Sequence, residues 1–230
     1  WLNRSTGYNP FTREGKKVCA YEIWEALDGR VPDRIVVPTG DGNLLSGMWK
    51  GWCDLRAVGL IERMPKIVAA QSDNSDAISR TVRTLRESGD DRPDWSAVVI
   101  ESVAATTLAD SISVNLPRDG LAAVRAIIES GGDVVTVTDQ EILAAIPEMS
   151  EMSGVFPEPA AAASWAAVKR LVDSNAIAAD EFVVCLVSGS GLKDVGAART
   201  AAQAPLVIDA TLDAVKESLS TGARPSDPLP

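Results

Sequence analysis

Histidine is absent from the 230 residues of the chain. This absence excludes a Ser-His-Asp triad, a Cys-His nucleophile pair, histidine-ligated zinc and imidazole acid–base catalysis within these residues. Cysteine is also scarce, because Cys19, Cys53 and Cys185 are widely spaced and form no CxxC motif. We therefore expect reduced thiols, no disulfide framework and no metal site.

Basic residues are fewer than acidic residues, and long apolar runs are absent. The chain has 22 Lys and Arg against 32 Asp and Glu, a net charge of −10. Nucleic-acid backbones are bound by clustered basic residues, so we expect no nucleic-acid partner. No apolar run approaches the length of a membrane span and no signal peptide opens the sequence, so we expect a cytoplasmic protein with no membrane partner. Because the first residue is Trp1 and not Met, we also expect a processed or truncated chain.

Apolar runs alternate along the chain with segments of helical periodicity. Hydrophobic residues make up 46% of the sequence, an ordinary composition for a globular protein with a sizeable core. The apolar runs predict strands at 34–38, 66–71, 133–138 and 205–210, and one within 181–191 that ends in a glycine turn. The periodic segments predict helices at 16–28, 44–60, 75–88, 121–132, 140–152, within 154–173 and at 211–220. Strands that are continuously apolar are typical of a parallel sheet covered on both faces, so the predicted fold class is α/β.

Local signals add three expectations about element ends. Residues 1–15 are polar and interrupted by Gly and Pro, which predicts a loop. Asp139 is predicted to cap the helix that follows it. Pro147 lies inside that predicted helix and predicts a break or kink.

The segment Thr39-Gly40-Asp41-Gly42-Asn43 joins the predicted strand 34–38 to the next helix. Glycines at 40 and 42 allow a sharp turn that leaves backbone N–H groups uncovered, and the helix N-terminus adds its own unpaired donors. Together these features predict an anion pocket suited to a phosphate. The alternative is a tight turn in which Asp41 or Asn43 only caps the helix. A carboxylate at position 41 would repel a phosphate unless it points away.

A second polar turn, Ser188-Gly189-Ser190-Gly191, follows the apolar run that begins at residue 181. A hydroxyl at the carboxyl end of a parallel strand lies where open α/β sheets bind ligands, and the neighbouring glycines leave room for a flat ring. The alternative is an ordinary turn. Upstream, residues 156–160 place prolines before an Ala-rich helix, which we interpret as a helix start whose small residues allow close packing.

Seven segments, taken in order, resemble the fold type II pyridoxal-phosphate enzymes of the tryptophan synthase β-subunit superfamily, and the threonine synthases in particular. These segments are NPFTREGKK (9–17), VVPTGDGNLLSGMWKG (36–51), GLIERMPKIVAAQ (59–71), LADSISVNLPRDG (108–120), SGGDVVTVTDQEI (130–142), GVFPEPAAAA (154–163) and VSGSGLKD (187–194). The resemblance covers the chain from about residue 7 to residue 195. It implies an open, mostly parallel sheet with helices on both faces, as in the cofactor-binding domain of these enzymes but incomplete.

The resemblance also implies a site. The positions that would hold the cofactor phosphate are Gly40, Asp41, Gly42, Asn43 and Leu44, where the family reads Gly-Asn-Gly-Gly-Asn. Ser188 would hydrogen-bond the pyridine nitrogen of pyridoxal 5′-phosphate. The implied domains are a loop and the end of a small domain (1–15), a cofactor-binding α/β domain (16–210) and a terminal helix with a polar tail (211–230). Family members are usually cytosolic homodimers.

For the reaction, the resemblance implies elimination or replacement on a small amino-acid substrate, first of all the conversion of O-phosphohomoserine to threonine. A dehydratase, an ammonia-lyase, a cysteate-synthase-like enzyme and a non-catalytic cofactor-binding fragment are the alternatives. The Schiff-base lysine of the family lies ahead of everything present here. None of the seven lysines matches it: Lys16, Lys17, Lys50, Lys66, Lys169, Lys193 and Lys216. We therefore expect no catalytic residue in this chain and a missing N-terminal segment or partner chain that supplies the lysine.

Overall fold

Four parallel strands form the sheet at the centre of the computed structural model, which describes residues 2–89, 93–202 and 207–221. The strands are β1 (Arg34–Pro38), β2 (Lys66–Ser72), β3 (Asp133–Val137) and β4 (Val183–Cys185). Their order in the sheet is β3-β2-β1-β4, and every neighbouring pair is parallel. The chain thus builds outward from β1 to β3, then returns to place β4 on the other side of β1.

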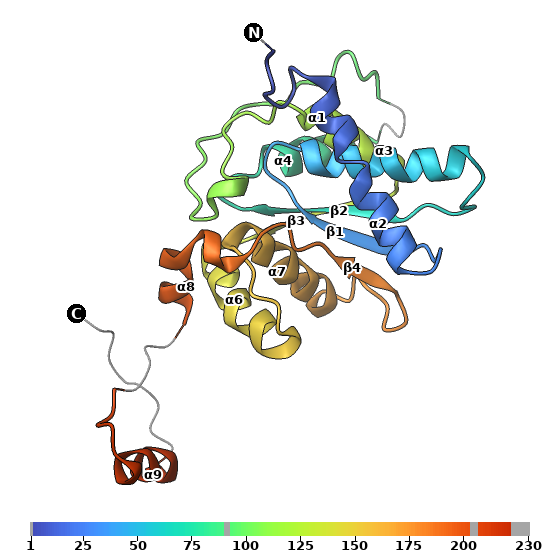
Figure 1. Cartoon of the computed structure of the whole chain (residues 1–230). Coiled ribbons are helices and arrows are strands. Elements are labelled where there is room, and N and C mark those ends of the chain that lie inside the picture. Colours follow the sequence, from blue (N-terminus) through green and yellow to red (C-terminus); the bar gives the residue numbers. More distant parts are fainter. Residues whose placement is uncertain (1, 90–92, 203–206, 222–230) are drawn as a thin grey trace.

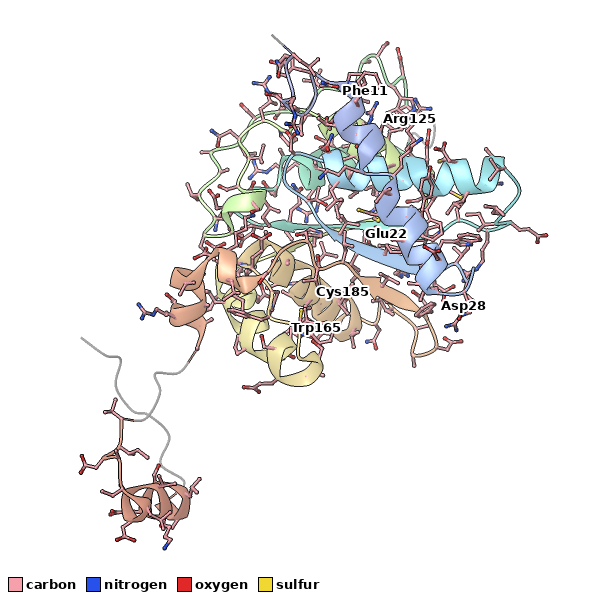
Figure 2. The ribbon with its side chains drawn as sticks, viewed as in Figure 1. Phe11, Glu22, Asp28, Arg125, Trp165 and Cys185 are labelled. Atoms are coloured by element: carbon pink, nitrogen blue, oxygen red, sulfur yellow. The ribbon has the colours of Figure 1, made fainter. Side chains whose placement is uncertain are left out.

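Helices cover both faces of this sheet (Figure 1). One layer contains α1 (Pro10–Gly15), α2 (Val18–Ala26), α3 (Asn43–Ala57), α4 (Ala77–Glu87) and α5 (Gly120–Glu129). The other contains α6 (Asp139–Ser153) and α7 (Pro159–Asp173), and α8 (Val195–Ala201) packs on α6. Two short 3₁₀ turns are η1 (Asp110–Ile112) and η2 (Gly191–Lys193), and α9 (Leu212–Thr221) ends the described residues. Figure 2 shows Arg125 of α5 and Trp165 of α7 on opposite sides of the sheet. No helix in the described part of the chain is long and apolar enough to cross a lipid bilayer.

Alternate side chains of β1 belong to two separate cores. Ile35 and Val37 pack in a cluster with residues of α3 and α5, including the fully buried Trp52. Val36 packs in a second cluster with residues of α6 and α7, among them Ala163. The uninterrupted apolar strand therefore reflects burial on both faces, which confirms the α/β class and the parallel sheet.

Some element boundaries differ from the sequence predictions. The expected loop at 1–15 contains α1, whose first turn begins at Pro10 after the Asn9 cap. The strand expected within 181–191 is reduced to β4, because the segment turns away from β1 after Leu186. The strand expected at 205–210 is wrong for residues 207–210, which are exposed and pair with no neighbour, while 203–206 lie outside the described residues.

The N-terminus of α6 corrects the predicted cap. Thr138, not Asp139, is the N-cap, because its hydroxyl accepts from the Glu141 N–H while the Glu141 carboxylate accepts from the Thr138 N–H. Asp139 is the first helical residue, and its carboxylate accepts from the Leu108 N–H at 3.0 Å. The helix continues through Pro147 to Ser153, so the predicted break does not occur.

The Glu141 carboxylate combines this cap with an ion pair to Arg170 of α7, at 2.6 Å from Arg170 Nε. Burial raises the pKa of the Glu141 carboxyl, but hydrogen bonds from Arg170 and Thr138 outweigh it and hold the pKa at about 2. A carboxyl whose folded pKa is depressed stabilises the fold above its unfolded pKa and loses this effect as the pH falls through the folded value.

We predict that Glu141→Gln lowers the free energy of unfolding at pH 7 by about 1–2 kcal/mol, less than the pKa shift alone implies because the pair is partly exposed. The deficit relative to wild type should shrink as the pH falls from about 4.5 towards 2, where the wild-type carboxyl becomes protonated. Urea unfolding at several pH values measures both effects. Glu151→Gln is the control on the same helix, since Glu151 is exposed and has no ion pair within the described residues. A deficit in the free energy of unfolding that does not change with pH would contradict the low pKa assigned to the Glu141 carboxyl.

Candidate functional site

The loop between β1 and α3 presents a row of free backbone donors. The N–H groups of residues 40–45 donate to no acceptor among the described residues, and the first N–H of this helix that is bonded belongs to Ser46, which donates to Gly42 O at 2.9 Å. These donors lie at the N-terminus of α3, the positive end of the helix dipole. The loop therefore has the donors and the field that a phosphate requires.

Only glycine fits at two positions of this loop. A Cβ at residue 40 would lie 2.7 Å from Ile112 Cα, which belongs to η1. Gly42 has φ +85°, and a Cβ there would lie 2.8 Å from Ala123 Cβ and 2.9 Å from Asp119 O. The glycines thus allow the loop to pack against two other segments, while its N–H groups find no acceptor among the described residues.

Asp41 directs its carboxylate to the segment before α5. Its Oδ1 accepts from the Arg118 N–H at 2.5 Å, and its carbonyl accepts from the Asp119 N–H at 3.1 Å. Next to it, Asn43 Nδ2 donates to Asp119 Oδ2 at 2.6 Å. One carboxylate oxygen of Asp41 is therefore engaged with residue 118, whereas Oδ2 is buried and has no hydrogen-bond partner among the described residues. Leu44 is half-buried and packs against the core beneath α3.

Ser188 follows β4 at the same edge of the sheet. β4 pairs with β1 in parallel, and the Leu186 N–H continues this pairing by donating to Val36 O at 3.0 Å. The carboxyl ends of both strands therefore meet, and the order of the strands reverses between them, where open α/β sheets form a ligand crevice. Ser188 is exposed, and its hydroxyl has no hydrogen-bond partner in the part of the chain that the structure describes.

The structure also brings together polar groups that the sequence analysis missed. Glu158, which precedes α7, forms an ion pair with Lys193 and accepts from the Ser111 hydroxyl of η1. These three residues come from segments far apart in the sequence. The position of Glu158 between two prolines predicted a helix start but carried no signal of its partners.

Four of the seven lysines are held in ion pairs: Lys17 with Asp54, Lys50 with Glu14, Lys169 with Glu148 and Lys193 with Glu158. Lys66 begins β2, at the end of the sheet opposite to the crevice. None of residues 39–45 or 186–191 is a lysine.

A model of the family described as pyridoxal-phosphate-dependent enzymes matches residues 1–189. Among curated proteins, the chain is 35% identical to a threonine synthase of Methanosarcina acetivorans and 36% identical to one of Methanocaldococcus jannaschii, each over 211 residues. Each match covers 92% of this chain and 50% of the relative, so the chain spans about half the length of these relatives.

Solved structures show the same fold. The processed form of threonine deaminase isoform 2 from Solanum lycopersicum matches with a TM-score of 0.64 and 18% identity, over 84% of this chain and 49% of that one. A threonine synthase from Brucella melitensis with bound pyridoxal phosphate matches with a TM-score of 0.59 and 17% identity, over 86% of this chain and 44% of that one.

We predict that Gly42→Ala weakens the binding of inorganic phosphate at least about tenfold, because the new methyl group would overlap Ala123 and Asp119 and force the loop apart. Gly59→Ala is the matched control, since Gly59 also has a positive φ (+77°) but a Cβ there meets nothing within 4 Å. Both substitutions should cost about 1 kcal/mol of backbone strain, and only the first should also change phosphate affinity. Equal phosphate affinities of the two variants, measured by calorimetry, would show that phosphate does not bind at this loop.

Proposed function

Because the chain belongs to the family of pyridoxal-phosphate-dependent enzymes, we propose that it forms the cofactor-holding part of a threonine-synthase-like enzyme. The reaction proposed is elimination and replacement on a small amino acid, with O-phosphohomoserine as the first candidate substrate and threonine as product. A homodimer in the cytoplasm belongs to this proposal. The observation that carries the proposal is that the unpaired N–H groups of residues 40–45 and the unpaired Ser188 hydroxyl follow the carboxyl ends of the neighbouring strands β1 and β4.

The donor set of this chain fits pyridoxal phosphate. The N–H groups of residues 40–44 would bind the phosphate, assisted by the dipole of α3. The Ser188 hydroxyl would donate to the pyridine nitrogen, since it is exposed and has no hydrogen-bond partner among the described residues. When bound, the cofactor supplies an electron sink for bond cleavage at the carbon atoms of an amino acid.

A hydroxyl at position 188 would influence the protonation of the pyridine nitrogen. A neutral donor does not stabilise a protonated pyridine nitrogen as a carboxylate would, so it keeps that nitrogen largely unprotonated and moderates the electron sink. Moderation of this kind suits elimination and replacement. A dehydratase or ammonia-lyase reaction uses the same property and remains within the proposed class.

We propose further that the lysine which binds the cofactor covalently is not part of this chain. The pairing of four lysines with carboxylates and the absence of lysine from residues 39–45 and 186–191 support this. The same observation favours a second function, in which the chain binds the cofactor without catalysis.

Binding of 4′-deoxypyridoxine 5′-phosphate to the 230-residue chain tests the proposed site, because this probe keeps the ring and the phosphate but has no aldehyde. Ser188→Ala should weaken it about fivefold to tenfold, the effect of losing one hydrogen bond, and should leave inorganic phosphate binding unchanged. Ser190→Ala is the control in the same loop, since the Ser190 hydroxyl accepts from the Leu192 N–H. A wild-type chain that does not bind the probe would refute the proposed function.

Reduction of the chain with borohydride in the presence of pyridoxal phosphate tests the location of the lysine. We expect peptide mapping to find no single lysine preferentially labelled, and we expect no phosphate release from O-phosphohomoserine by the 230-residue chain alone. One dominant labelled lysine together with threonine formation would show that the catalytic lysine lies within the chain. Phosphate release only after addition of a lysine-bearing partner segment would favour the enzyme over the non-catalytic alternative.

A further inference from the structure

Glu158 is a buried acid whose side chain does not cap the helix that it precedes. It occupies the N-cap of α7, yet its side chain makes no capping hydrogen bond to that helix. Only 6% of the side chain is exposed. A buried carboxylate requires partners, so its interactions indicate what it holds in place.

Those partners form a closed triangle at the carboxyl edge of the sheet. Glu158 Oε2 lies 2.8 Å from Lys193 Nζ and 3.2 Å from Ser111 Oγ. Lys193 Nζ in turn donates to Ser111 Oγ at 2.7 Å. The triangle links α7, η1 and η2, and η1 is the element that packs against Gly40 of the phosphate loop.

The same residue also fixes the loop that carries Ser188. The Glu158 N–H donates to Gly189 O at 2.9 Å, and the Gly191 N–H donates to Phe156 O at 2.8 Å. Glu158 Oε1 packs directly on Gly189, where a Cβ would overlap it, and Oε1 has no hydrogen-bond partner among the described residues. Gly189, the residue next to Ser188, is therefore held by a hydrogen bond from the Glu158 backbone and by contact with the Glu158 side chain.

We propose that Glu158 is a positioning residue for the Ser188 hydroxyl, with Lys193 and Ser111 holding its carboxylate. This inference rests on the proposed function, because it assigns Ser188 to the cofactor ring. The triangle fixes the spacing between the loop that would bind the phosphate and the loop that would bind the ring, since Ser111 belongs to the segment in contact with Gly40. Preorganised spacing reduces the ordering that binding would otherwise require.

The test is a double-mutant cycle on the 230-residue chain, with 4′-deoxypyridoxine 5′-phosphate as the probe and its dissociation constant as the readout. Glu158→Gln should weaken binding about fivefold in the wild-type background and less than about twofold in the Ser188→Ala background, because the substitution acts through that hydroxyl. Inorganic phosphate, which lacks the ring, should bind the Glu158→Gln variant as it binds wild type. Glu148→Gln is the matched control, since Glu148 also pairs with a lysine, Lys169, but this pair is only partly buried and links α6 to α7.

Three outcomes overturn the proposal. An unchanged affinity in Glu158→Gln shows that the residue does not position Ser188. Equal weakening with and without the Ser188 hydroxyl, or equal loss of phosphate binding, shows a general structural effect. A wild-type chain that binds phosphate but not the probe refutes the proposed function itself, and this inference with it. If Glu158→Gln does not fold, as judged by circular dichroism, Lys193→Gln replaces it with the same expectations, since Lys193 is 61% exposed.

Discussion

The parallel pairing of β4 with β1 is the constraint on which the candidate site depends. β1 is the first strand of the sheet, and β2 and β3 extend it in one direction only. When the chain returns to the opposite side of β1, the residues after β4 must emerge beside the residues after β1. Two loops that are far apart in the sequence then follow neighbouring strands at one edge of the sheet, where the order of the strands reverses.

Polar contacts between loops then determine the shape of this crevice. Asp41 binds the backbone before α5, and the Ser75 hydroxyl donates to Ile112 O while it accepts from the Val114 N–H. Each such hydrogen bond stabilises the structure by only about 1 kcal/mol, so no single one fixes the loops. Together they hold η1 between the loop of residues 39–45 and the Glu158 cluster, while the N–H groups of residues 40–45 and the Ser188 hydroxyl have no partner among the described residues.

Local sequence patterns correctly predicted the elements whose structure depends mainly on their own residues. The apolar runs at β1 and β2 predicted buried parallel strands, and the glycines at 40 and 42 predicted the sharp turn before α3. For features that depend on residues distant in the sequence, the predictions were wrong or were not made. Thr138 is the cap in place of the predicted Asp139, whose carboxylate accepts from the Leu108 N–H. The partners of Glu158, Lys193 and Ser111, come from distant segments and left no local pattern in the sequence. Residues 207–210 have the composition of a strand, but no neighbouring strand lies beside them.

The central claim is that one crevice of this chain holds both ends of the cofactor. A crystal structure of the 230-residue chain with 4′-deoxypyridoxine 5′-phosphate tests it most directly. The account predicts the phosphate within hydrogen-bond distance of the N–H groups of residues 40–44 and the pyridine nitrogen within hydrogen-bond distance of Ser188 Oγ. A ligand bound elsewhere, or a phosphate in the loop with the ring turned away from Ser188, would contradict it.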